Sequence, residues 1–127
     1  LDAHGIAGRP HIKTHKLPLL AHKQVKAGAV GITVQTLGEA EVMAAAGIED
    51  ILITYNVIGE HKARRLAGLA RTIPNLRVAV DNQLALDTVI AAGSMARGCC
   101  GNAARSLIIK AFRRPIMARS SPAFTPI

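Results

Sequence analysis

The chain has 127 residues, half of them hydrophobic, which is the length of one ordinary domain with enough apolar material for a core. Its formal net charge is +8, and its aromatic residues are one Tyr, two Phe and no Trp. So few aromatic side chains leave little on which single-stranded nucleic acid could stack, so we expect no nucleic-acid partner. No apolar run approaches the roughly 18 residues of a membrane-spanning helix, so we expect no membrane partner.

The positive charge is concentrated at one end of the chain. Residues 1–93 carry ten Lys or Arg against eight Asp or Glu, whereas residues 94–127 carry six Lys or Arg and no acid. The charge distribution therefore weakens a nucleic-acid-binding interpretation further. The two cysteines, Cys99 and Cys100, are adjacent, so we expect neither a disulfide framework nor a CxxC metal site, and the cytoplasm is the default location.

Residues 1–93 repeat one pattern four times, a strand-like run followed by a helix-like run. The strand-like runs are HIKTH, VGITVQT, ILITYN and LRVAVD, and the helix-like runs are PLLAHKQVKAG, LGEAEVMAAAG, GEHKARRLAGLART and NQLALDTVIAAG. Pro18 suits the first turn of the first helix, and Asn82 is a candidate cap for the fourth, which we expect to end at Gly93.

This alternation predicts an α/β fold with a parallel sheet. An open doubly wound sheet and about four units of a (β/α)8 TIM-like barrel both fit the pattern. Residues 94–127 show no clear strand and helix rhythm, although SLIIKAF is a candidate short element. We therefore divide the chain into residues 1–93 and an irregular basic tail, residues 94–127, which is either flexible or the product of a shifted reading frame.

Alternate residues of a strand share a face, and we expect the β-branched faces to pack against the helices. The opposite faces are unusually polar for a packed barrel interior, and such folds place binding sites near the C-terminal ends of their strands. The inward polar set is His11, Lys13, His15, Thr33, Gln35, Thr54, Asn56 and Asp81. Tyr55, on the other face, is expected to pack among helices.

The stretch RPHIKTHK, residues 9–16, holds the candidates for chemistry. On a strand, His11 and His15 lie about 13 Å apart at roughly 3.3 Å per residue, too far to share one metal, so we expect no metal site there. Lys13, between two histidines, is expected to have its ammonium form disfavoured by burial and like charge. A neutral amine attacks aldehydes, as in pyridoxal phosphate enzymes, although a surface lysine is the simpler interpretation.

RPHIKTHK, the long run from GAVGITVQ to TYNVIG, and RVAVDN together resemble the N-terminal part of the D-threonine aldolase and D-serine dehydratase group. These enzymes are alanine-racemase-like, with an N-terminal pyridoxal phosphate barrel of fold type III. The resemblance runs over residues 1–93 and ceases near Ser94. It implies that residues 1–93 are a partial barrel domain and that the chain is an N-terminal fragment.

The resemblance implies that Lys13 carries pyridoxal 5'-phosphate and is the catalytic residue of a lyase acting on D-hydroxy amino acids, by retro-aldol cleavage or by dehydration. His15, Gln35 and Asn56 are candidate cofactor-binding residues, with polar groups that satisfy one another inside the barrel as the equal alternative. Arg9 is expected to pair with an acid at the surface. Lys16 is expected on the opposite strand face or in the following loop, without the cofactor role.

In this family the phosphate-gripping residues and the ligands of a divalent metal lie beyond the point where the resemblance ends, so we expect no metal ligands in this chain. We expect the fragment to be weakly active or inactive, and a non-catalytic pyridoxal phosphate-binding barrel is the alternative. The expected partner is a small-molecule D-amino acid, with a homodimer as one option for the full-length form.

Overall fold

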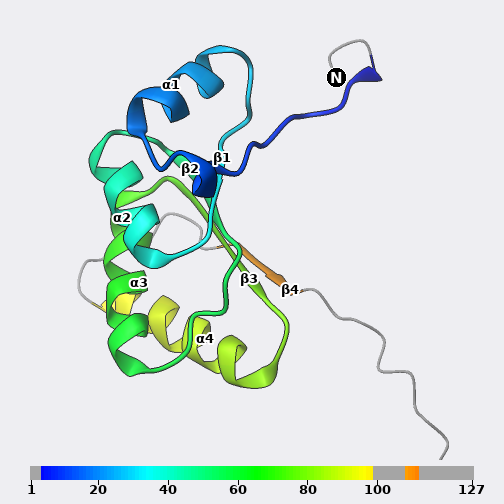
Figure 1. Cartoon of the computed structure of the whole chain (residues 1–127). Coiled ribbons are helices and arrows are strands. Elements are labelled where there is room, and N and C mark those ends of the chain that lie inside the picture. The colour runs from blue at the N-terminus through cyan, green and yellow to red at the C-terminus, as the bar shows by residue number, and fades with distance from the viewer. Residues whose placement is uncertain (1–3, 99–107, 112–127) are drawn as a thin grey trace, which may run out of the picture.

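The computed structural model describes residues 4–98 and 108–111 of the chain. The elements, in chain order, are a 3-10 helix (Ile12–Thr14), α1 (Pro18–Lys26), β1 (Ile32–Val34), α2 (Leu37–Ala45), β2 (Asp50–Ile53), α3 (Glu60–Thr72), β3 (Asn75–Val80), α4 (Gln83–Gly98) and β4 (Ile108–Ala111) (Figure 1). Within the described ranges, every helix is too short or too polar to cross a membrane.

The strands form one parallel sheet in the order β1-β2-β3-β4. In its register Ile32 lies opposite Ile51, and Ile51 lies opposite Leu76. Because parallel neighbours are joined by right-handed crossovers, a sequential strand order brings successive helices to the same face of the sheet. Figure 1 shows α1 to α4 along one side of the strands, and each helix contacts the next. The predicted α/β class is confirmed.

The core lies between the sheet and its helices. In β3 the side chains of Leu76, Val78 and Val80 are buried while Arg77 and Ala79, which alternate with them, are half-buried. β2 buries Ile51 and Ile53 in the same way, so the prediction that the β-branched faces pack on helices is confirmed. The helices contribute mainly alanine and leucine to this core, among them Ala40, Ala63, Leu66, Ala67, Ala70, Ala85, Ala92 and Ala96.

Most predicted helix boundaries agree with the structure. Pro18 is the first residue of α1, and α3 ends at Thr72, just before Ile73 and Pro74. The predicted end of the fourth helix at Gly93 is wrong, because α4 continues to Gly98. Gly93 is buried within α4 and does not cap it.

The predicted first strand, HIKTH, is also wrong. The chain runs beside β1 earlier in the sequence, at residues 8–11: Val30 donates a hydrogen bond to the carbonyl of Gly8, Thr33 donates to the carbonyl of Pro10, and His11 forms a parallel β-bridge with Thr33. Residues 12–14 then turn into the 3-10 helix. His11, Lys13 and His15 therefore do not share a strand face, and the strand spacing used against a shared metal does not apply.

The tail is described only in part. β4 falls within SLIIKAF, which confirms a short element there, and it pairs with β3. Residues 99–107 and 112–127, with Cys99 and Cys100, lie outside the described residues. The division of the chain at residue 93 stays a prediction.

Candidate functional site

The carboxyl ends of the parallel strands meet at one edge of the sheet, the lower edge in Figure 1. β1 is followed by Gln35, β2 by Thr54, Tyr55 and Asn56, and β3 by Asp81. Loops at this edge are where α/β folds of parallel strands place binding sites. The structure thus collects much of the predicted polar set at the edge where function is expected.

Lys13 lies in the 3-10 helix, immediately after the segment that pairs with β1. Its backbone N–H donates a 3.2 Å hydrogen bond to Nδ1 of His11, the cap residue of that helix. The side chain of Lys13 is exposed, so the burial that we expected to disfavour its ammonium form is not found. The turn, defined here as residues 12–16, presents an accessible amine.

His11 is the titratable neighbour of Lys13. Burial and then the ammonium of Lys13 lower the pKa of His11 below its ordinary value of 6.5, while Glu39 opposes them. His11 is therefore neutral at pH 7, and because Nδ1 accepts from the backbone of Lys13, the ring proton sits on Nε2. A neutral His11 beside Lys13 provides a hydrogen-bond donor at Nε2.

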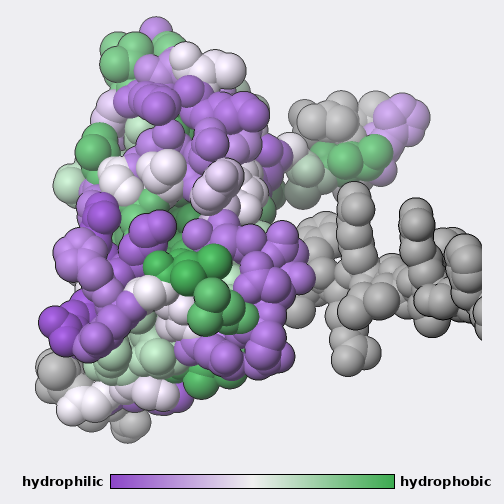
Figure 2. Space-filling model, turned by 60° about the horizontal axis from the view of Figure 1, so that its bottom comes forward, coloured by the Kyte–Doolittle hydropathy of each residue, from purple (hydrophilic) through white to green (hydrophobic). Residues whose placement is uncertain are grey.

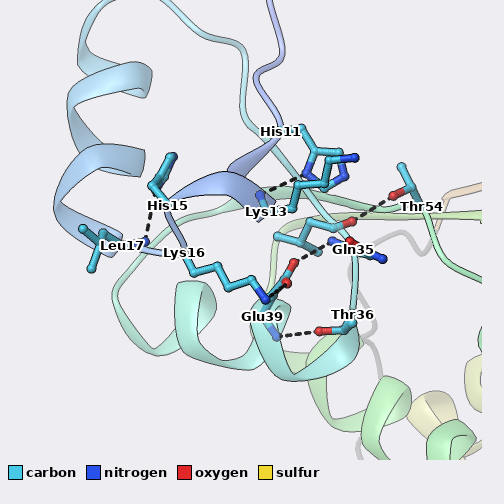
Figure 3. Close-up of polar contacts among 10 residues, drawn as sticks. His11, Lys13, His15, Lys16, Leu17, Gln35, Thr36, Glu39 and Thr54 are labelled. Carbon is cyan, nitrogen blue, oxygen red and sulfur yellow. Dashed lines mark hydrogen bonds and ion pairs between the residues drawn. The ribbon is translucent and has the colours of Figure 1, made fainter.

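Gln35 follows β1 and lies below Lys13 in the close-up (Figure 3). Its backbone N–H donates a 2.7 Å hydrogen bond to Oε2 of Glu39 in the first turn of α2. Thr54, directly after β2, donates its hydroxyl to the carbonyl of Val34 at 3.1 Å. Gln35 and Asn56 line one small hollow, of about 210 Å³, between the loops that follow β1 and β2. The structure therefore brings these two predicted residues together.

Asn56 is fixed by the loop that follows β3. Its Nδ2 donates a 2.7 Å hydrogen bond to Oδ1 of Asp81, which also accepts a 2.7 Å bond from Nδ2 of Asn82. A larger hollow of about 710 Å³ lies here, lined by Thr54, Tyr55, Asn56, Ile58, Lys62, Ala79, Val80 and Asp81. Its lining supplies a positive side chain (Lys62), a negative side chain (Asp81), an amide and two hydroxyl groups.

The same edge also exposes apolar side chains. Figure 2 turns this edge toward the viewer and shows apolar atoms gathered between hydrophilic side chains. Ile58 before α3 is 38% exposed and Leu84 in α4 is 60% exposed. Tyr55 is 64% exposed, so the prediction that it packs among helices is wrong. Tyr55 instead lines both hollows, which makes it part of the candidate site.

His15 does not join the other candidates. Figure 3 shows its ring on the α1 side of the turn, whereas Lys13 points over Gln35. Its Nδ1 accepts a 3.1 Å hydrogen bond from the backbone N–H of Leu17, and its Nε2 is buried with no hydrogen-bond partner among the described residues. In the described part of the chain, no three His, Cys, Asp or Glu side chains are placed to hold a metal ion.

Sequence reasoning missed two contributors to this edge, Glu39 and Lys62. Glu39 forms an ion pair with Lys16, with Nζ and Oε1 3.2 Å apart. Lys16 lies in the loop after the 3-10 helix, which is one of the two positions predicted for it. The spacing Thr36-x-x-Glu39 is a capping-box pattern that would have located Glu39 at the start of a helix. Nothing in the local sequence singles out Lys62.

The known proteins that are similar to this chain include aldolases and a dehydratase. The chain is 46% identical over 81 residues to a D-threonine aldolase from Arthrobacter sp., and 41% identical over 93 residues to a D-threo-3-hydroxyaspartate dehydratase from Delftia sp. (strain HT23). The crystal structure of D-threonine aldolase from Filomicrobium marinum matches 87% of the chain with a TM-score of 0.73 and 33% identity. No family model matches the chain.

These matches cover only part of the relatives. They involve 64% and 73% of this chain but 21% of the Arthrobacter protein and 24% of the Delftia protein. The chain likewise covers 28% of the Filomicrobium structure. It thus spans about a fifth to a quarter of the length of the curated relatives that it matches.

Proposed function

We propose, from the homology of this chain to one part of D-threonine aldolase and D-threo-3-hydroxyaspartate dehydratase, that it is a portion of a pyridoxal phosphate-dependent lyase acting on D-hydroxy amino acids. The relatives named in the comparisons are aldolases and dehydratases, which are lyases. The observation that carries the proposal is Lys13, whose exposed amine lies in a turn held beside the carboxyl edge of the sheet.

The sequential strand order supports a partial (β/α)8 barrel over the alternative doubly wound sheet. A doubly wound sheet reverses its strand order at a switch point and carries helices on both faces. The order here is β1-β2-β3-β4 without reversal, and α1 to α4 lie on one face (Figure 1). The uncovered face, which carries Leu52, Arg77 and Ala79, is then the barrel interior.

The described residues fit the aldehyde end of pyridoxal phosphate, which is the part that reacts with an amine. Lys13 supplies an accessible amine, and Gln35 and Asn56 supply amides at the same edge of the sheet. When bound, this cofactor withdraws electrons from the substrate carbon that loses its bond. His11 holds the backbone of Lys13 and offers its Nε2–H as a donor, and the Lys13 amine, when free, is a base.

The proposed substrate is a small D-amino acid with a hydroxyl group on the adjacent carbon. Its carboxylate is negatively charged, and Lys62 supplies a positive charge in the lining of the larger hollow. Tyr55 and Thr54 add hydroxyl groups to the same lining. We propose no metal ligand within the described residues, and we expect this chain alone to have little or no activity.

The test is covalent uptake of the cofactor by the purified chain. Pyridoxal phosphate is added, the linkage is reduced with borohydride, and peptide mass spectrometry identifies the modified lysine. We expect modification at Lys13, its loss in Lys13→Ala, and no loss in Lys26→Ala, which changes an exposed lysine of α1. Equal modification of all exposed lysines would overturn the proposal. Uptake at Lys13 without cleavage of D-threonine is the result that we expect of this chain alone, and cleavage of D-threonine by the purified chain would contradict the expected lack of activity.

A further inference from the structure

Glu39 ties three segments of the candidate site together. Its side chain is only 9% exposed, and its carboxylate accepts the backbone N–H of Gln35 at 2.7 Å and pairs with the ammonium of Lys16 at 3.2 Å. The backbone N–H of Glu39 donates a 3.2 Å hydrogen bond to the hydroxyl oxygen of Thr36. One carboxylate thus joins the turn that carries Lys13, the end of β1 and the start of α2 (Figure 3).

Lys16 closes that turn in an unfavourable backbone conformation. Its φ is +53°, and it is the one non-glycine residue with positive φ in residues 4–98 and 108–111. Its N–H and that of His15 both donate to the carbonyl of Ile12, at 2.8 and 3.1 Å. Left-handed backbone costs free energy in a residue with a side chain, so the surrounding contacts must hold it.

The charge on Glu39 is present throughout the neutral range. Burial raises the pKa of Glu39, but the N–H of Gln35 and the ammonium of Lys16 outweigh burial and bring the pKa below its ordinary value of 4.5. Lys16 remains 62% exposed, and an ion pair with one exposed partner adds little to global stability. The Lys16–Glu39 ion pair is therefore expected to affect the local stability of the turn that Lys16 closes.

We infer that Lys16 and Glu39 are positioning residues, which hold the turn 12–16 against the start of α2 and so set where the Lys13 amine lies relative to Gln35. The inference rests on the proposed function in taking Lys13 as the cofactor lysine. Two consequences separate it from a surface pair without effect. Breaking the pair loosens the turn, and it weakens cofactor uptake at Lys13.

The first readout needs no cofactor. Amide hydrogen exchange of His15 and Lys16 reports the two bonds to Ile12 that close the turn. Lys16→Met and Glu39→Gln each remove the pair, and Gln still offers an oxygen to the N–H of Gln35. We expect both variants to exchange these amides on the order of tenfold faster, with β2 and β3 unchanged. Unchanged exchange at the turn would overturn the inference.

The second readout is the affinity of Lys13 for pyridoxal phosphate, measured by titration followed by borohydride reduction. We expect both variants to weaken uptake on the order of tenfold and Lys16→Arg, which keeps the cation, to restore most of it. Arg64→Met is the matched control, because it removes an exposed ion pair with Glu60, far from the turn in sequence. Faster exchange with unchanged uptake at Lys13 would refute the positioning role.

The two proposals fail in different ways. If the chain without substitutions takes up no cofactor at Lys13, the proposed function is wrong. Hydrogen exchange at the turn 12–16 then decides alone whether Lys16 and Glu39 hold that turn. If the chain takes up cofactor at Lys13 and the pair variants match it in both readouts, the proposed function stands and the positioning inference falls.

Discussion

Arg9 donates a hydrogen bond from Nη1 to Oδ1 of Asp50 at 2.6 Å across 41 residues of sequence. Arg77, from β3, pairs with the same carboxylate oxygen. The three side chains are only 18–22% exposed. The prediction that Arg9 pairs with an acid is confirmed, although the pair is largely covered instead of at the surface. Asp50 thereby joins the N-terminal segment, β2 and β3 at the end of the sheet opposite the candidate site.

Asp50→Asn should destabilise the chain substantially. It leaves two largely covered guanidinium groups without their carboxylate, and removing one partner of such a network costs more than an exposed pair contributes. We expect a loss of about 2–3 kcal/mol in the free energy of unfolding by urea. Glu60→Gln, which breaks an exposed pair within α3, is the control and should cost no more than about 0.5 kcal/mol. Equal losses would contradict the assignment.

Gly31→Ala should be costly for two reasons. Gly31 has a φ of +148°, and a Cβ there would lie 2.6 Å from the backbone oxygen of Asp50 and closer still to the guanidinium of Arg9. We expect a loss of more than about 2 kcal/mol in urea unfolding, since backbone strain and overpacking add. Gly47→Ala separates backbone strain from overpacking, because Gly47 has a φ of +86° with open space around it. This variant should lose only about 1 kcal/mol in the free energy of unfolding.

Much of the fold was predictable because its signals are local. Alternating β-branched residues in ILITYN and LRVAVD identified β2 and β3 and the faces that they bury. Pro18 and Asn82 marked helix starts for reasons of local hydrogen bonding. The local pattern alone left a barrel and a doubly wound sheet open, because that choice depends on strand order, which no local pattern encodes. The partial barrel implied by the family resemblance stays a prediction.

The predictions that failed depend on contacts distant in sequence. Ile12 and Thr14 are β-branched and favoured a strand, but pairing with β1 occurs at residues 8–11, and the chain turns once Ile12 enters the core. Gly93 resembled a helix end, yet it is buried inside α4, which packs against α3 and continues to Gly98. Tyr55 followed the buried face of β2 in sequence, but β2 ends at Ile53 and the alternation ends with it.

The candidate site was predicted in part. Gln35 and Asn56 were placed at the correct edge by strand alternation, and both line a hollow there. His15 was misplaced, because the face it was given belonged to a strand that does not form. The role of Glu39 was missed, because its contact with Lys16 depends on the turn that replaces that strand.

Asn82→Ala should remove the cap of α4. The side-chain oxygen of Asn82 accepts the N–H of Ala85 at 2.9 Å, and its amide donates to Asp81. Losing an N-terminal cap typically costs about 1 kcal/mol, which urea unfolding would detect. Asn82→Ser keeps a capping oxygen and should lose clearly less. If the two variants are equally stable, the cap does not contribute as the structure indicates.

Acid should destabilise the chain in two separable steps. His11 has a pKa lowered below 6.5 by burial and then by Lys13, so the unfolded chain binds its proton first and stability falls as pH drops below 6.5. Burial raises the pKa of Glu39, but the Gln35 N–H and Lys16 lower it below 4.5 overall. Glu39 therefore stabilises the fold above 4.5, and that contribution is lost as pH falls through its folded pKa.

Urea midpoints measured between pH 7.5 and 3.5, on the order of one point per half unit, would resolve the two steps. His11→Asn should flatten the part of the curve just below pH 6.5 while leaving the lower step. Glu39→Gln should flatten the lower step and leave the upper one present or slightly larger, since the charge of Glu39 raises the pKa of His11 and its removal lets burial and Lys13 lower that pKa further. A lower step that survives in Glu39→Gln would instead point to Glu41, whose pKa is lowered by its hydrogen bonds from Arg65 against the effect of burial.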